Sequence, residues 1–202
     1  PVPSSLRAIA AESRLVPGGT GAFRGAIAAQ DAGAPTGALL YLDLDQFKIV
    51  NDTCGHIAGD ELLKRLAGLL SLQLDSADTL ARLGGDEFVV LLPEVADERD
   101  AERVAKRILD LMREPIFVGG QECFVTASVG IAVYPRDGMS MADLLRNSDV
   151  AMHSVKAGGR NASSVYSPAL AGRGREIATN NLIGEHAETP IARLCSLVIA
   201  SA

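Results

Sequence analysis

The sequence predicts an α/β fold of the α+β sandwich type, in which helices flank a central, mostly antiparallel sheet. Apolar runs typical of strands alternate with segments whose leucines recur at helical spacing. In chain order the main elements read strand, helix, strand, strand, helix, strand, which is the split βαβ order of a ferredoxin-like core. A Gly-Gly pair between the two middle strands predicts a tight hairpin, because glycine adopts positive φ readily.

Each expected element has a local signal. Strands are expected at short apolar runs bounded by turn residues: 37–44, 78–83, 88–92, 125–133 and 162–166. Helices are expected where apolar residues recur three and four positions apart: 59–72, 97–112 and 141–157. Asp97 is the expected N-cap of the second helix, and Gly158-Gly159 should end the third. A smaller hairpin with a Gly-Gly turn is expected over 117–124.

The composition is that of a folded domain. The chain has 202 residues, of which 48% are hydrophobic and 22% charged, enough for one core with flanking segments. Its net charge of −6 argues against binding a nucleic-acid polymer, which usually needs a basic face. No apolar run could span a bilayer and no signal peptide is recognisable, so no membrane contact by this segment is expected. Cys54, Cys123 and Cys195 lack zinc-site spacing, which predicts a reducing compartment and thiols without a role.

The most informative motif is Gly84-Gly85-Asp86-Glu87, between two apolar strands. The hairpin should present both acids beside almost bare backbone, where a metal ion could be held and a phosphate could approach. A purely structural turn would need one acid or none. We therefore expect Asp86 and Glu87 to belong to a functional site.

A second acidic segment points to the same chemistry. Asp43 and Asp45 end an apolar strand and, being two residues apart, share one face of it. Carboxylates at the end of a core strand are costly unless a cation compensates for their desolvation. Mg²⁺ favours one or two carboxylates together with substrate phosphates. The alternative for this pair alone is an ordinary solvated strand end.

Polar residues after Asp45 add weaker signals. Lys48 could contact a phosphate, and Asn51 with Asp60 offers the amide and carboxylate that could read a guanine edge. Each has a plain alternative, since a lone lysine is usually a solvated charge and Asp60 could cap its helix. Lys156 and Arg160 lie four residues apart at a helix end, where an exposed basic cluster is also favoured by the helix dipole.

Several motifs together resemble the GGDEF domain family over residues 37–166. They are Leu42-Asp-Leu-Asp-Gln-Phe-Lys48, Asn51-Asp-Thr-Cys-Gly-His56, Gly59-Asp60, Arg82-Leu-Gly-Gly-Asp-Glu-Phe88, Ala127-Ser-Val-Gly-Ile-Ala132 and Lys156-Ala-Gly-Gly-Arg-Asn161. Their order and spacing fit the family. The resemblance implies the palm-like fold of nucleotidyl cyclases and the activity of a diguanylate cyclase, which condenses two GTP into cyclic di-GMP.

The resemblance also implies roles for individual residues. Asp43, the Leu44 carbonyl and Asp86 would bind Mg²⁺ or Mn²⁺, and Glu87 would be a further ligand or base. Asn51 and Asp60 would read guanine, and Gly84 and Gly85 would let the nucleotide approach the hairpin. Three basic residues would bind the β- and γ-phosphates: Lys48, Lys156 and Arg160.

The resemblance implies partners as well. One domain would hold one GTP, so catalysis would need a homodimer. We expect sensor or EAL domains in a longer protein, and a cytoplasmic, bacterial location that a membrane sensor could tether. The expected division is an N-terminal segment (1–36), the GGDEF domain (37–166) and a linker-like tail of unknown role (167–202).

The chain departs from the family pattern at three places. Over 12–23, Gly19 and Thr20 stand where the family has Asn and Arg, which puts activity in doubt. Asp78 remains from the usual inhibitory product site but its Arg is absent, so tight product inhibition is not expected. His153 stands where a Tyr is usual and is expected to be a packing or surface residue. The alternative to an active cyclase is therefore a catalytically silent GTP-binding module; a scaffold that binds no nucleotide is disfavoured by the intact acids.

Overall fold

The computed structural model describes residues 36–170 of the chain. The strands are β1 (Thr36–Asp45), β2 (Thr79–Gly84), β3 (Glu87–Val95), β4 (Ile116–Val118), β5 (Gln121–Cys123), β6 (Thr126–Tyr134) and β7 (Ala162–Val165). The helices are α3 (Phe47–Cys54), α4 (His56–Ser71), α5 (Glu98–Leu111) and α6 (Met141–Gly158). The expected family block at 12–23, Cys195 and most of the tail at 167–202 lie outside the described residues.

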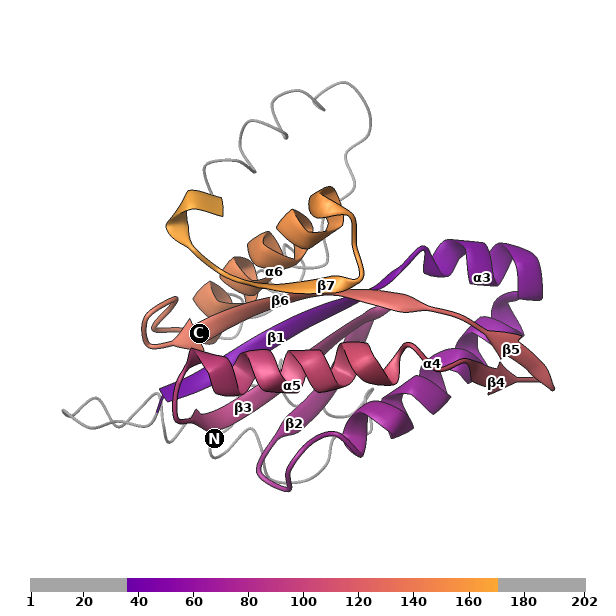
Figure 1. The fold of residues 1–202 in the computed structure, drawn as a ribbon, viewed down its shortest axis with the longest axis horizontal. Coiled ribbons are helices and arrows are strands. Elements are labelled where there is room, and N and C mark those ends of the chain that lie inside the picture. Colours follow the sequence, from indigo (N-terminus) through magenta and orange to yellow (C-terminus); the bar gives the residue numbers. More distant parts are fainter. Residues whose placement is uncertain (1–35, 171–202) are drawn as a thin grey trace, which may run out of the picture.

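The five-stranded sheet has the order β2-β3-β1-β6-β7, and β4 and β5 form a separate hairpin. β1 is antiparallel to both β3 and β6, β2 is antiparallel to β3, and β7 joins the edge parallel to β6. Figure 1 shows the layers, with α5 and α4 on one side of the sheet and α6 on the other. The predicted mostly antiparallel sandwich with a ferredoxin-like core is therefore confirmed.

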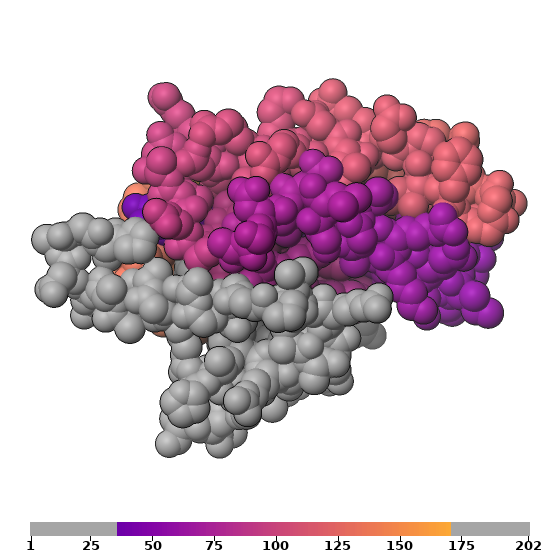
Figure 2. Space-filling model, turned by 90° about the horizontal axis from the view of Figure 1, so that it is seen from below, coloured from indigo at the N-terminus to yellow at the C-terminus, as the bar shows by residue number. Residues whose placement is uncertain are grey.

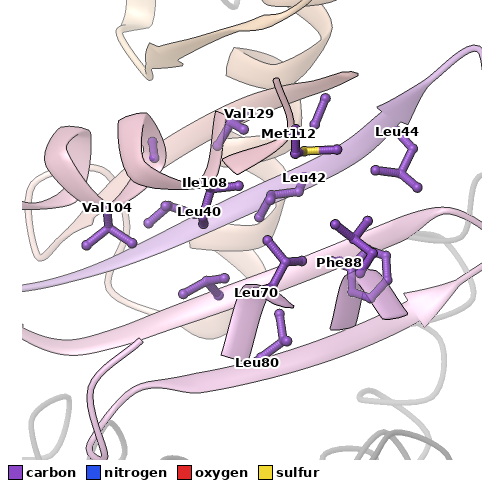
Figure 3. Packing of buried hydrophobic residues seen from close by; sticks show 14 of the residues in the cluster. Leu40, Leu42, Leu44, Leu70, Leu80, Phe88, Val104, Ile108, Met112 and Val129 are labelled. Atoms are coloured by element: carbon purple, nitrogen blue, oxygen red, sulfur yellow. The ribbon is translucent and has the colours of Figure 1, made fainter. Parts of the chain in front are cut away.

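Alternate residues of β1 point to opposite faces of the sheet and so pack in two different hydrophobic cores. Leu40, Leu42 and Leu44 face α4 and α5, where they pack with Phe88, Ile108 and the other residues labelled in Figure 3. Leu39 and Tyr41 face α6 and belong to a smaller core. The next odd positions on that face are Asp43 and Asp45, so the sheet turns from apolar to acidic at one end of the α6 side.

Two boundaries differ from the prediction. The short helical turns expected between Gln46 and Asp60 are a full helix, α3, and the next helix starts at His56 rather than Gly59, because the break falls at Gly55, whose φ of 84° ends α3. Asp60 therefore lies inside α4 and is not its cap. β3 continues to Val95 through Pro93, and a register shift opposite Thr36 and Ala38 accommodates the proline.

Local signals for caps and turns were reliable. Asp97 accepts hydrogen bonds from the backbone N–H groups of Arg99 and Asp100 and so caps α5. The β4–β5 hairpin turns at Gly119 and Gly120, which both have positive φ. No helix in the described range 36–170 is long and apolar enough to cross a membrane.

Gly130 of β6 allows α6 to lie unusually close to the sheet. A Cβ at this position would collide with the Ser148 carbonyl and the Met152 amide of α6, which are backbone atoms that cannot move aside alone. The opposite residue on β1 is Tyr41, a large side chain of the α6 core. The α6 backbone therefore occupies the space that a side chain would need.

Replacing this glycine should destabilise the fold. Gly130→Ala is expected to cost roughly 3 kcal/mol, because helix and sheet must separate to admit the methyl group. Gly68→Ala is the matched control: Gly68 is an exposed α4 residue where an added Cβ would point into open space, so helix propensity should stabilise that variant by about 0.8 kcal/mol. Urea unfolding of both variants measures the difference. Equal effects at the two glycines would contradict the close contact.

Candidate active site

The Gly84–Glu87 hairpin is held tightly against the end of β1. Glu87 pairs with Gly84 across a turn made by Gly85 and Asp86, and Gly85 has a φ of 53°. The Gly85 carbonyl accepts a hydrogen bond from Arg82 Nε at 2.9 Å. The Asp86 carbonyl accepts one from the Leu44 amide at 3.3 Å. The hairpin tip and the acidic end of β1 are thus brought together, as predicted.

Strand register places Glu87 and Asp43 on the same face. They are direct partners in the β1–β3 ladder. Val89 and Leu91, which share the Glu87 face of β3, pack in the α6 core. Both carboxylates therefore lie on the side of the sheet that α6 covers.

Helix α6 contributes a cation to this acidic end. Lys156 Nζ lies 2.7 Å from Asp43 Oδ2, and the Asp43 side chain is only 12% exposed. Ion pairs this buried require close geometry to offset the loss of hydration. Lys156 is in the last turn of α6, where the helix dipole also favours a positive charge.

The carboxylates are crowded despite this cation. Burial raises the pKa of Asp43, the Lys156 ion pair partly offsets the rise, and the charges of Asp86 and Asp45 add to it. Burial likewise raises the pKa of Glu87, and the charges of Asp43, Asp149 and Asp86 contribute. Ionised forms are disfavoured at this end of the sheet, and an additional cation would stabilise them.

Two residues at this site were missed by sequence reasoning. Asp149 lies seven residues before Lys156 on α6, and its pKa is raised by burial, while the charges of His153 and Lys156 lower it. His153 Nε2 lies 3.5 Å from Asp149 Oδ1, and His153 is itself exposed, as expected for a surface residue. The helical spacing of 149, 153 and 156 was the available signal.

The second missed residue is Tyr41. Its hydroxyl is fully buried close to Glu87 but makes no hydrogen bond of normal geometry within 36–170. Burial and the neighbouring Glu87 charge raise its pKa far above the usual value, so the phenol stays protonated. The protonated Tyr41 hydroxyl is therefore available as a hydrogen-bond donor close to Glu87.

Asp45 has a different role from Asp43. It accepts hydrogen bonds from Thr126 Oγ1 and Ser128 Oγ, both at 2.7 Å, and from the Asn161 amide at 3.1 Å. These bonds tie β1 to β6 and to the segment after α6. Asp45 is therefore a structural acid in this arrangement.

The expected nucleotide-binding residues fall into two groups. Asn51 on α3 is half-buried, and its side-chain amide packs directly on Gly59, the residue before Asp60. The structure therefore brings Asn51 against the residue that precedes Asp60. Asp60 is itself exposed on α4, as is Lys48 on α3. Arg160 is exposed just past α6 with a φ of 66°, an uncommon conformation for a residue with a side chain.

The donor set fits a magnesium ion that shares its coordination with a ligand. Within the described residues, no group of three or more acids, histidines or cysteines is close enough to form a complete protein cage. Mg²⁺ does not need one, since it commonly binds one or two carboxylates and takes waters and phosphates for the rest. Asp43 and Asp86 supply hard oxygen ligands, and an added cation would favour the ionised form of Asp43, whose pKa burial raises.

Fold and site together define a class: a palm-like nucleotidyl-cyclase domain with acids at the end of its central strand and on the adjoining hairpin. The family model described as "Diguanylate cyclase, GGDEF domain" matches residues 23–162. The chain belongs to the GGDEF family.

Its relatives carry two kinds of names. The chain is 42% identical over 146 residues to the probable diguanylate cyclase DgcE of Escherichia coli, matching 72% of this chain and 13% of that protein. It is 41% identical over 133 residues to the cyclic di-GMP phosphodiesterase NbdA of Pseudomonas aeruginosa, matching 66% of this chain and 17% of that protein. The chain therefore spans less than a fifth of these two relatives.

A solved structure has the same fold. The isolated GGDEF domain of TpbB from Pseudomonas aeruginosa aligns with a TM-score of 0.71 and 35% identity. The alignment covers 76% of this chain and 88% of that one. Diguanylate cyclases of this family depend on divalent metal, in agreement with the donor set described above.

Removing the Asp45 carboxylate should destabilise the fold. Asp45→Ala leaves the buried Ser128 hydroxyl without its acceptor, so we expect a loss of about 2 kcal/mol. Asp52→Ala, at an exposed acid on α3, is the control and should change stability by less than about 0.5 kcal/mol. Denaturant unfolding tests both, and a neutral Asp45→Ala would show that its hydrogen bonds contribute nothing.

Neutralising Glu87 should stabilise the metal-free chain. Because the folded pKa of Glu87 is raised, the native state gains a proton before the unfolded state as pH falls, so its charge costs stability at neutral pH. Glu87→Gln should gain about 0.5–1 kcal/mol at pH 7.5, a figure reduced for partial exposure, and the gain should vanish near pH 4.

Urea unfolding in chelator at both pH values measures this difference. Glu94→Gln, at an exposed acid of the same strand, is the control and should have no effect at either pH. A Glu87→Gln variant that is less stable than the parent at pH 7.5 would mean that the carboxylate is stabilised by its neighbours.

Proposed function

We propose that this chain is a diguanylate cyclase domain, which joins two GTP into cyclic di-GMP and releases pyrophosphate. The observation that carries the proposal is the meeting of Asp43, Lys156 and the Asp86–Glu87 hairpin at one end of the sheet. The family match and the relatives named as diguanylate cyclases support it. The reaction is attack of one 3′-hydroxyl on the α-phosphate of the other nucleotide.

Asp43, Asp86 and the Leu44 carbonyl would hold Mg²⁺ or Mn²⁺ in the loaded enzyme. The metal supplies charge neutralisation at the phosphates and acidifies the attacking hydroxyl. Glu87 would act as a further ligand or as the base, and burial raises its pKa, which makes its carboxylate a better proton acceptor than an exposed one. Lys156, paired with Asp43 here, would then turn its charge toward the phosphates.

The remaining residues position the nucleotide. Asn51 and Asp60 would bind one guanine edge, where the amide can donate or accept and the carboxylate accepts from guanine N–H groups; the packing of Asn51 on Gly59, the neighbour of Asp60, supports this pairing. Lys48 and Arg160 would bind the outer phosphates, and Gly84 and Gly85 leave open space at the hairpin backbone. Such positioning accounts for much of the rate enhancement in phosphoryl transfer.

One domain of this size offers one guanine-reading pair, so a second copy would bring the second GTP. We therefore propose that the active form is a homodimer related by a twofold axis. The missing Arg at the usual inhibitory site leaves Asp78 bound to the Asp75 amide within its own turn, so tight product inhibition is not expected. Sensor or EAL domains in a longer protein are proposed from relatives such as the bifunctional MucR.

The second candidate is a silent GTP-binding module that regulates an attached phosphodiesterase. A relative named as a phosphodiesterase and the altered block at 12–23 favour it. The two functions differ in turnover, while GTP binding is common to both.

Removing the Asp86 carboxylate tests the metal-binding role. Asp86→Asn should reduce formation of cyclic di-GMP by roughly 100-fold or more, because a charged ligand of the metal is lost. The full chain is incubated at high concentration with GTP and Mg²⁺, and products are separated by chromatography. Glu122→Gln, at an exposed acid on β5, is the matched control and should retain activity.

The same assay separates the two functions. Product from the parent chain supports the cyclase, and full activity of Asp86→Asn would refute the assigned metal site. A parent chain that binds GTP by calorimetry, with a preference over ATP, but makes no product would support the regulatory module instead.

A further inference from the structure

Two cysteines that are far apart in the sequence meet at one end of the molecule. Cys54 is the last residue of α3, and Cys123 is the last residue of β5. Figures 1 and 2 both place the junction of α3 and α4 beside the β4–β5 hairpin. Helix α4 packs against β4 there, and Cys54 is close enough to affect the pKa of the Cys123 thiol through a side-chain hydrogen bond.

The two thiols differ in their exposure to solvent. Cys54 is exposed, whereas Cys123 is 7% exposed and paired in register with Ile116 of the hairpin. Burial raises the pKa of the Cys123 thiol, and its contact with Cys54 raises the pKa further. Cys54 can therefore meet a reagent from solvent, and Cys123 is shielded from any reagent except its neighbour.

We propose that Cys54 and Cys123 form a redox-active thiol pair that closes to an intrachain disulfide between α3 and the β4–β5 hairpin. The pair is reduced in the structure. In a reducing compartment such a bond is transient and responds to oxidants, which distinguishes it from a structural disulfide. The inference is independent of the cyclase activity.

The chemistry needs a disulfide oxidant such as oxidised glutathione. The Cys54 thiolate attacks one sulfur of the oxidant, forming a mixed disulfide and releasing one glutathione thiolate. The Cys123 thiolate then attacks the Cys54 sulfur and releases the second glutathione. The protein loses two protons and two electrons, and one oxidised glutathione becomes two reduced ones.

The bond would restrain the helix that carries Lys48 and Asn51. Cys54 is three residues beyond Asn51, and the Gly55 amide donates to the Asn51 carbonyl at 2.9 Å. A covalent link to β5 would fix this end of α3 against the hairpin. Any effect on GTP binding rests on the proposed function, whereas formation of the bond does not.

The test uses the full chain carrying Cys195→Ser, so that only the two thiols in question remain. Treatment of the native protein with oxidised glutathione should lower its mass by two hydrogens and remove both titratable thiols. Tryptic digestion without reductant should then yield residues 49–64 linked to residues 114–136. Dithiothreitol should reverse every change.

Two further variants keep the proposal falsifiable. Adding Cys123→Ser should trap a stable glutathione adduct on Cys54, because no second thiol resolves it. Adding Cys54→Ser should leave the buried Cys123 largely unreacted in the native protein. A stable adduct on Cys54 with Cys123 still present, or a link between two chains in place of the intrachain peptide pair, would overturn the proposal.

Discussion

The close approach of α6 to the sheet over Gly130 is the constraint on which the candidate site depends. Because the α6 backbone lies where a side chain of β6 would otherwise be, the last helical turn comes near the end of β1. A lysine at position 156 then reaches Asp43 at 2.7 Å from a neighbouring layer. The same approach half-buries Asp149 and places its charge near Lys156, Asp43 and Glu87. The absence of a side chain at Gly130 thus brings the charged groups of α6 close to Asp43 and Glu87 and so affects the pKa values of these acids.

The negative charges at this end of the sheet lower the stability of the domain when no cation is bound. Asp43 and Glu87 both have raised pKa values, which means that the folded state holds their negative charges less favourably than water does. The larger core formed by β1, α4 and α5 on the opposite face is apolar and well filled, and it supplies the stability that this end lacks (Figure 3). A site that disfavours its own charges until a cation arrives is suited to binding metal together with nucleotide.

The sequence was most informative where structure is determined locally. The Asp97 cap, the Gly119-Gly120 turn and the alternation along β1 follow from residues within a few positions of one another. Residues 46–60 were expected to form a loop with short helical turns, and the full extent of α3 and the start of α4 at His56 were not predicted. Gly59 suggested a helix start, whereas it is needed inside α4 to admit the Asn51 side chain. Asp149 and the contact between Cys54 and Cys123 depend on tertiary packing, and no local pattern encodes it.

The described residues bear differently on the two candidate functions. The buried Asp43 carboxylate beside Lys156 and the half-buried hairpin acids disfavour a scaffold that binds nothing, because such a protein would carry their cost without any gain. They do not distinguish turnover from binding, since holding GTP and Mg²⁺ uses the same charges. In the proposed cyclase, turnover additionally requires a second site to be presented face to face, because residues 36–170 hold the proposed guanine-reading residues once. The difference between a cyclase and a regulatory module therefore lies in how two such domains are brought together.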